Sequence, residues 1–136
     1  MDPSIAFHHI NWLAVIVAAA APFVIGSLWY GPVFGQIWMR LTGISKDTPG
    51  QNSMGLTMGM TAVLNLIIAI SLAFFIGDGG WRFGMQAGFA AGFTFVAMAF
   101  GVVYLFESRP LKLWFVNAGY QTLVFTVMGT ILGAWH

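Results

Sequence analysis

The chain has 136 residues, of which 59% are hydrophobic and only 7% are charged, whereas an ordinary soluble domain is about 25% charged. Five Lys or Arg and four Asp or Glu residues cannot cover a water-soluble surface, and this composition excludes both a disordered chain and a nucleic-acid binder with a basic patch. The absence of Cys excludes disulfides, thiol catalysis and cysteine-ligated metal clusters. The composition therefore predicts a polytopic membrane protein.

The first predicted element is a membrane-spanning helix over residues 10–30, within a long stretch that has no charged residue. An apolar run of about 20 residues crosses the ~30 Å hydrocarbon core of a bilayer. Ala19, Ala20 and Ala21 suit signal-peptide cleavage, but no Lys or Arg precedes the run and the run continues past them. We therefore expect an uncleaved span, with a kink at Pro22, where a backbone hydrogen bond is lost.

A short amphipathic segment is predicted after this span. Its apolar residues recur at helical spacing: Phe34, Ile37, Trp38, Leu41 and Ile44. Gln36 and Arg40 lie on another face of the same helix, a pattern typical of a segment that lies in the membrane interface. A polar loop over residues 48–53 then returns the chain to the membrane.

Three more uncharged stretches predict spanning helices over residues 56–77, 83–106 and 113–135. The glycine-rich run at 77–80 predicts a tight turn that makes a hairpin of the second and third spans. All spans must be helical. Four segments cannot close a barrel, and in lipid the backbone N–H and C=O groups of a span must form hydrogen bonds with one another. We expect an all-α membrane protein with a single domain over residues 1–136, four transmembrane helices and the amphipathic segment after the first.

The basic residues of the connections predict the orientation. The loops after the first and third spans carry Arg40, Lys46, Arg109 and Lys112. The opposite side carries only Arg82, so the positive-inside rule places these two loops in the cytoplasm and both termini outside it. Five tryptophans mark the predicted span ends as an interfacial belt: Trp12, Trp29, Trp81, Trp114 and Trp135.

Glycines recur four residues apart in three of the predicted spans. They are Gly55 and Gly59, then Gly84, Gly88 and Gly92, then Gly129 and Gly133. Small residues at this spacing let helix backbones approach closely in lipid. Two interpretations stay open, namely packing within one four-helix bundle and a seam between copies of a chain too short to enclose much space alone.

Candidate binding residues gather by depth at the end that is predicted to face the cytoplasm. They are Tyr30, Asn65, Tyr104, Glu107, Arg109, Asn117, Tyr120 and Gln121. No charged residue lies at mid-span, which argues against a proton relay or an ion-coupled pump. Two interpretations stay open: hydrogen bonds between helices, worth ~0.6 kcal/mol each on average, and a site for a ligand or ion. Glu107 with Arg109 or Lys112 also fits a plain interfacial ion pair.

The histidines do not predict a metal or haem site. His8, His9 and His136 fall on the predicted outer face, without fixed spacing to a third ligand, and no His lies within a span. The sequence also has no nucleophile elbow, phosphate-binding loop or zinc-protease motif. We therefore expect no metal, no cofactor and no enzymatic activity.

Two motif blocks resemble those of a known family. The first is Asn11-Trp12-Leu13-Ala14-Val15 followed by Trp29-Tyr30-Gly31-Pro32, and the second is Phe106-Glu107-Ser108-Arg109-Pro110 followed by Lys112-Leu113-Trp114 and Asn117-Ala118-Gly119-Tyr120. They are similar to motifs of the bacterial family of small membrane proteins known as domain of unknown function 1761. The resemblance implies a four-span protein of a bacterial inner membrane, and it implies no particular activity.

Three functions stay open. The favoured one is a small homo-oligomeric channel, transporter or binding protein for a small neutral solute or lipid. The second is a structural or accessory subunit of a larger membrane complex, suggested by the abundance of Gly, Phe and Trp. The least favoured is a membrane enzyme that uses Glu107 as acid or base at the lipid interface. The expected partners are membrane lipid, copies of this chain or a larger membrane complex, and no nucleic acid.

Overall fold

The computed structural model describes residues 10–44 and 53–135, and every regular element in these two ranges is helical. Four helices are long and apolar enough to span a membrane: Trp12–Val33, Met54–Ile76, Gly80–Phe106 and Leu111–Ala134. Their ends lie within three residues of the predicted bounds, which confirms an all-α fold with four candidate spans. Most of the predicted polar loop, as well as His8, His9 and His136, lies outside the described residues.

Two of the four spans contain a π-helical segment. The first span is α2 (Trp12–Leu28) followed by η1 (Trp29–Val33). The third is α5 (Gly80–Ala90), η2 (Ala91–Ala97) and α6 (Met98–Phe106). The second and fourth are the uninterrupted helices α4 (Met54–Ile76) and α7 (Leu111–Ala134).

The helix ends follow local sequence signals. The side chains of Asn11 and Ser53 accept hydrogen bonds from the first turns of α2 and α4, each at 3.1 Å, as N-cap residues do. The predicted amphipathic segment is α3 (Gly35–Thr42), which ends at Gly43 with a left-handed φ of 74°. Glycine suits this position because it has no Cβ to clash with the backbone.

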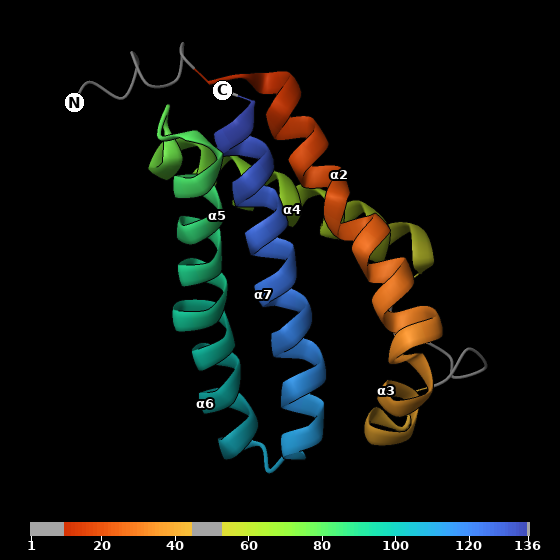
Figure 1. Cartoon of the computed structure of the whole chain (residues 1–136). Helices are drawn as coiled ribbons and strands as arrows, with labels where there is room; N and C mark the ends of the chain where they lie inside the picture. Colours follow the sequence, from red (N-terminus) through yellow and green to blue (C-terminus); the bar gives the residue numbers. More distant parts are fainter. Residues whose placement is uncertain (1–9, 45–52, 136) are drawn as a thin grey trace.

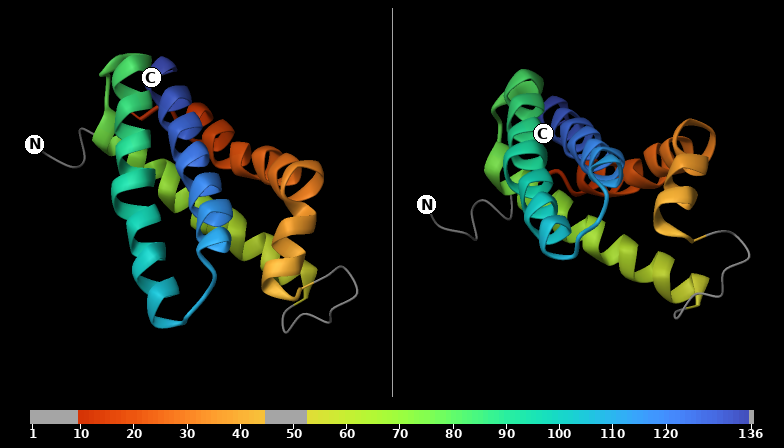
Figure 2. Two further views of the ribbon diagram at one scale, coloured as in Figure 1. Left: turned by 60° about the horizontal axis from the view of Figure 1, so that its bottom comes forward. Right: turned by 90° about the horizontal axis from the view of Figure 1, so that it is seen from below.

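The spans are close together at one end of the molecule and spread at the other. The hairpin of α5, α6 and α7 is flanked by α2, with α4 behind (Figure 1). At the end where α6 joins α7, the start of α4 lies apart from this hairpin (Figure 2). We call this the α3 end and the opposite one the Gly77 end, where the Asn11 side chain donates to the Trp135 carbonyl at 3.5 Å.

The apolar core accounts for this shape. Its buried residues come from three helices: Ala14, Val15 and Ala18 of α2, Ala69, Leu72 and Ile76 of α4, and Val124, Phe125, Met128 and Leu132 of α7. All of them lie in the halves of these helices that are nearest the Gly77 end. The helices are therefore held together at that end and leave space between them at the α3 end.

A seam of glycines joins α5 to α7. We define it as Gly84, Gly88, Gly129 and Gly133. A Cβ at Gly84 would overlap the carbonyl of Gly129, and a Cβ at Gly88 would overlap the carbonyl of Phe125. The glycines of α5 and α7 therefore pack within one chain, which supports the first of the two interpretations for this pair of helices.

The glycines of α4 behave differently. A Cβ at Gly55 or Gly59 would have no atom within 4 Å, apart from its own helix. Every residue from 54 to 60 is exposed. These two glycines therefore pack against no other element within the described part of the chain.

The connection between α6 and α7 has a left-handed serine. Ser108 has a φ of 57°, where L residues with a Cβ are strained. Its N–H donates to the Leu105 carbonyl at 3.3 Å, and the N–H of Arg109 donates to the Tyr104 carbonyl at 2.9 Å. This pair of bonds is the Schellman motif, which usually has glycine at the left-handed position.

We expect Ser108→Gly to raise the free energy of unfolding by about 1 kcal/mol, because glycine removes the Cβ strain of the left-handed conformation. Gly43→Ala, at the left-handed end of α3, is the matched reverse change and should weaken α3 by a similar amount. Denaturation in detergent micelles measures the first effect, and helix content by circular dichroism measures the second. A Ser108→Gly protein less stable than wild type would contradict the assigned backbone geometry.

Candidate ligand-binding site

Asn117 joins three of the four spans at the α3 end. The Tyr30 hydroxyl of η1 donates to Asn117 Oδ1 at 2.6 Å. Asn117 Nδ2 in turn donates to the Tyr104 hydroxyl of α6 at 2.8 Å. All three side chains are half-buried, so this chain of hydrogen bonds lies outside the buried apolar core.

Arg109 extends this polar group to the surface. Its guanidinium lies 5.2 Å from the centre of the Tyr104 ring, a cation–π distance. One of its nitrogens is 3.4 Å from Glu107 Oε1, and both side chains are about half exposed. This ion pair was one of the sequence interpretations, but 3.4 Å is long beside the ~2.8 Å of a strong charge-assisted bond. Arg109 therefore keeps donors for another partner.

A cavity of about 350 Å³ lies between the α3 region and the start of α7. It is lined by Trp38, Leu41, Thr42 and Ile44 on one side and by Arg109, Pro110, Leu113 and Asn117 on the other. We call it the Arg109 pocket. Its volume falls within the ~300–1,000 Å³ of ligand pockets in proteins.

The polar groups of the Arg109 pocket differ in what they still offer. The Thr42 hydroxyl is occupied, because it donates to the Trp38 carbonyl at 2.8 Å and accepts from the Ile44 N–H at 3.2 Å. The Asn117 amide uses one N–H and one lone pair for the two tyrosines and keeps the others. Arg109 and Asn117 therefore keep donors that can bind a polar ligand in this pocket.

Tyr120 lies beside this site but serves another contact. Its ring centre is 5.0 Å from that of Tyr30. Its hydroxyl donates at 2.8 Å to the carbonyl of Pro22, in the interior of α2. Tyr120 therefore ties α7 to α2, and its hydroxyl hydrogen is not available to a ligand.

Asn65 and Gln121 do not join the site. Both are half-buried, and neither side chain makes a hydrogen bond within the described part of the chain. Asn65 lies on α4, which spreads away from the α6–α7 hairpin at this end (Figure 2). Gln121 lies where α7 passes η2, since its carbonyl would be 3.2 Å from a Cβ at Gly92. Of the eight predicted residues, the structure thus brings together Tyr30, Tyr104, Glu107, Arg109 and Asn117, with Tyr120 next to them.

Sequence reasoning missed the contribution of α3 to the site. Trp38, Leu41 and Thr42 line the Arg109 pocket, and the Trp38 ring meets the Tyr30 ring edge-on at 5.8 Å. The amphipathic pattern predicted that α3 lies in the membrane interface, but it did not predict that α3 lines a pocket with the start of α7. The π-helical segment η1 directs α3 back toward the start of α7, and no spacing in the sequence predicted that segment.

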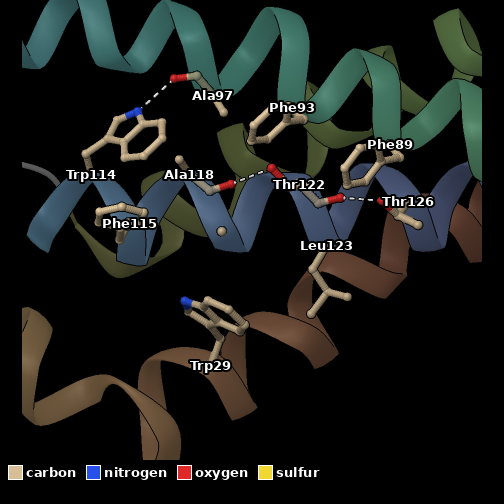
Figure 3. A pocket seen from close by; sticks show the side chains of 11 residues that line it. Trp29, Phe89, Phe93, Ala97, Trp114, Phe115, Ala118, Thr122, Leu123 and Thr126 are labelled. Carbon is tan, nitrogen blue, oxygen red and sulfur yellow. Dashed lines mark hydrogen bonds between the residues drawn. The ribbon is translucent and has the colours of Figure 1, made fainter. Parts of the chain in front are cut away.

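A second cavity, of about 560 Å³, lies along α7 between η1 and the third span (Figure 3). Five of its eleven lining residues are aromatic. Both of its indole N–H groups donate to backbone carbonyls, Trp29 to Val116 at 2.9 Å and Trp114 to Ala97 at 2.8 Å. The hydroxyl hydrogens of Thr122 and Thr126 are likewise bonded within α7. This groove therefore offers a ligand hydrocarbon contact and no free side-chain donor.

Comparison with known proteins places the chain in a family. The family model described as "Protein of unknown function (DUF1761)" matches residues 13–133, a range that contains every candidate binding residue. No match is found among the curated proteins or among the solved structures. The match covers nearly the whole chain and agrees with the two motif blocks, so the protein belongs to the DUF1761 family.

Proposed function

We propose that this protein binds the head of a membrane lipid, or of a lipid-like amphiphile, in the Arg109 pocket. One observation carries the proposal: the pocket has free polar groups on Arg109 and Asn117, and apolar side chains on the facing wall. Such a mixed surface suits a molecule with a polar head and an apolar tail. A fully neutral solute would not use the guanidinium charge.

The position of the pocket supports a lipid. Among the described residues, the charges lie at the ends of the spans: Arg40, Glu107, Arg109 and Lys112 at the α3 end, and Asp78 and Arg82 at the Gly77 end. The Arg109 pocket therefore lies at the depth of lipid headgroups. By the positive-inside rule, we propose that the α3 end faces the cytoplasm of a bacterial inner membrane and that both chain ends face the other side.

We favour binding over ion-coupled transport and over catalysis. Coupled transport uses charged side chains within the spans, and the Asp, Glu, Lys and Arg residues of the described chain lie at the span ends. Among the described residues, the one carboxylate near the site is that of Glu107, which is about half exposed and does not line the Arg109 pocket. A general acid or base needs to reach the bound substrate.

Filling the pocket tests the proposal. We expect Leu41→Trp to weaken lipid binding about tenfold, because the larger side chain occupies the cavity without removing a polar group. Ile37→Trp is the matched control, since Ile37 lies on the same helix, is exposed and does not line the pocket. Native mass spectrometry of delipidated protein, titrated with phospholipids in mild detergent, measures the affinity. Equal affinities of the two variants for every lipid would overturn the proposal.

The exposed start of α4 favours a second role, in assembly. Residues 54–60 are exposed all round, and Gly55 and Gly59 would let another helix approach closely. A second copy of this chain is the partner that we propose, and a larger membrane complex is the alternative. Purification in mild detergent separates the two, because a stoichiometric foreign subunit would favour the accessory role and copies of this chain alone would favour the homo-oligomer.

A further inference from the structure

We infer that the head bound in the Arg109 pocket is the phosphate of a lipid with net negative charge; this inference rests on the proposed lipid-binding function. Three features of the described residues lead to it: a guanidinium held in place beside the pocket, an excess of positive charge at the α3 end, and an uncapped helix N-terminus at the same position.

Contacts with Tyr104 position Arg109 beside the pocket. Its backbone N–H is bonded to the Tyr104 carbonyl at 2.9 Å, and its guanidinium lies over the ring of the same Tyr104, 5.2 Å from the ring centre. The Tyr104 hydroxyl accepts from Asn117 at 2.8 Å. The guanidinium and the free amide N–H are therefore linked through one tyrosine, and a planar guanidinium fork matches phosphate oxygens in geometry and charge.

The charges around the pocket discriminate between lipid classes. At the α3 end the described residues carry the cations Arg40, Arg109 and Lys112 and the single anion Glu107. A zwitterionic head would bring its ammonium group into this positive field, whereas an anionic head brings only negative charge. Clusters of basic residues at a membrane surface recognise anionic lipids in this way.

The start of α7 adds to the positive electrostatic field around the pocket. Pro110 is the N-cap of this 24-residue helix, and no side chain caps it. The first N–H groups of a helix and its dipole favour a nearby anion. Pro110 lines the Arg109 pocket, so this partial positive charge acts on the same ligand as the guanidinium.

Glu107 is the group that the phosphate replaces. It meets Arg109 at 3.4 Å on the exposed side, so a phosphate at shorter distance would take over those donors. Glu107→Gln removes the competing charge without changing the shape of the side chain. We therefore expect Glu107→Gln to bind anionic lipid more tightly than wild type, by about two- to fivefold.

The experiment compares phosphatidylglycerol with phosphatidylethanolamine of the same acyl chains, titrated into the full-length protein in mild detergent and followed by native mass spectrometry. Wild type should prefer phosphatidylglycerol by about tenfold. Arg109→Gln should abolish the preference, and Arg109→Lys should keep part of it, because it keeps the charge and loses the fork. Arg82→Gln is the matched control, since it removes the same charge at the Gly77 end and should keep the full preference.

Several results would overturn the inference. They are equal affinity of wild type for the two lipids, an equal loss of preference in Arg82→Gln, and weaker phosphatidylglycerol binding by Glu107→Gln. Inorganic phosphate that displaces phosphatidylglycerol at equal concentration would assign the site to a soluble anion and would overturn the lipid assignment. If Leu41→Trp still weakens binding of both lipids, the proposed lipid-binding function stands while the anionic specificity fails; if Leu41→Trp changes nothing, the proposed function itself fails.

Discussion

Gly88→Ala will lower the free energy of unfolding by about 2–3 kcal/mol, because a single methyl group has no room in the seam between α5 and α7. A Cβ at Gly88 overlaps the carbonyl of Phe125, which is part of the α7 backbone and cannot rotate away. The two helices must therefore move apart, and this loses contacts along the whole seam. Unfolding of the purified protein with increasing concentrations of a denaturing detergent measures the change in the free energy of unfolding.

The matched control for this prediction is Gly59→Ala. It makes the same chemical change in a spanning helix, but a Cβ at Gly59 meets no atom within 4 Å. For the monomer, which lacks the proposed contact between copies at Gly59, we expect a change in the free energy of unfolding below about 1 kcal/mol, of either sign, from helix propensity alone. Equal destabilisation by the two variants would show that glycine flexibility and not close helix packing determines the effect at Gly88.

Asn117→Leu is expected to cost about 2 kcal/mol of stability, because it removes two hydrogen bonds within the membrane and leaves two tyrosine hydroxyls without their partner. Leucine has the same number of side-chain heavy atoms, branched at the same carbon, so the loss reports on the polar contacts and not on a cavity. Gln121→Leu is the control one helical turn away, since the Gln121 side chain makes no hydrogen bond within the described residues, and should change stability by less than about 0.5 kcal/mol.

A double-mutant cycle separates the two bonds of Asn117. Tyr30→Phe removes the donor of the 2.6 Å bond and leaves the ring in place. If that bond joins the first span to α7, Tyr30→Phe should lower the free energy of unfolding of wild type but should hardly change that of the Asn117→Leu variant. Additive costs would mean that the two side chains stabilise the protein independently, which would contradict the assigned network.

The shape of the molecule explains where a ligand can enter. The glycine seam and the core of α2, α4 and α7 lie toward the Gly77 end, where the helices are closest. At the α3 end the spans are tied by polar contacts of Asn117 and by few buried apolar residues. Close packing at one end thus leaves a pocket at the other, beside the residues that carry the charge.

The candidate site was predictable only in part. Tyr30, Tyr104 and Asn117 could be grouped from the sequence, because distance along a spanning helix fixes depth in the membrane. Asn65 has a similar predicted depth but lies on α4, which spreads away from the site. Depth is a one-dimensional quantity, so it cannot tell which helices are neighbours at a given level.

The sequence by itself determined the four spans, the amphipathic α3 and the polar residues at one end, since each depends on composition and periodicity along a single helix. Only the tertiary structure decided three further points: the glycines of α5 and α7 face each other while those of α4 do not, Asn117 bonds to two tyrosines on other spans, and α3 covers the start of α7. These depend on how helices rotate and cross, which follows from packing between segments far apart in the chain and not from the pattern within any one of them.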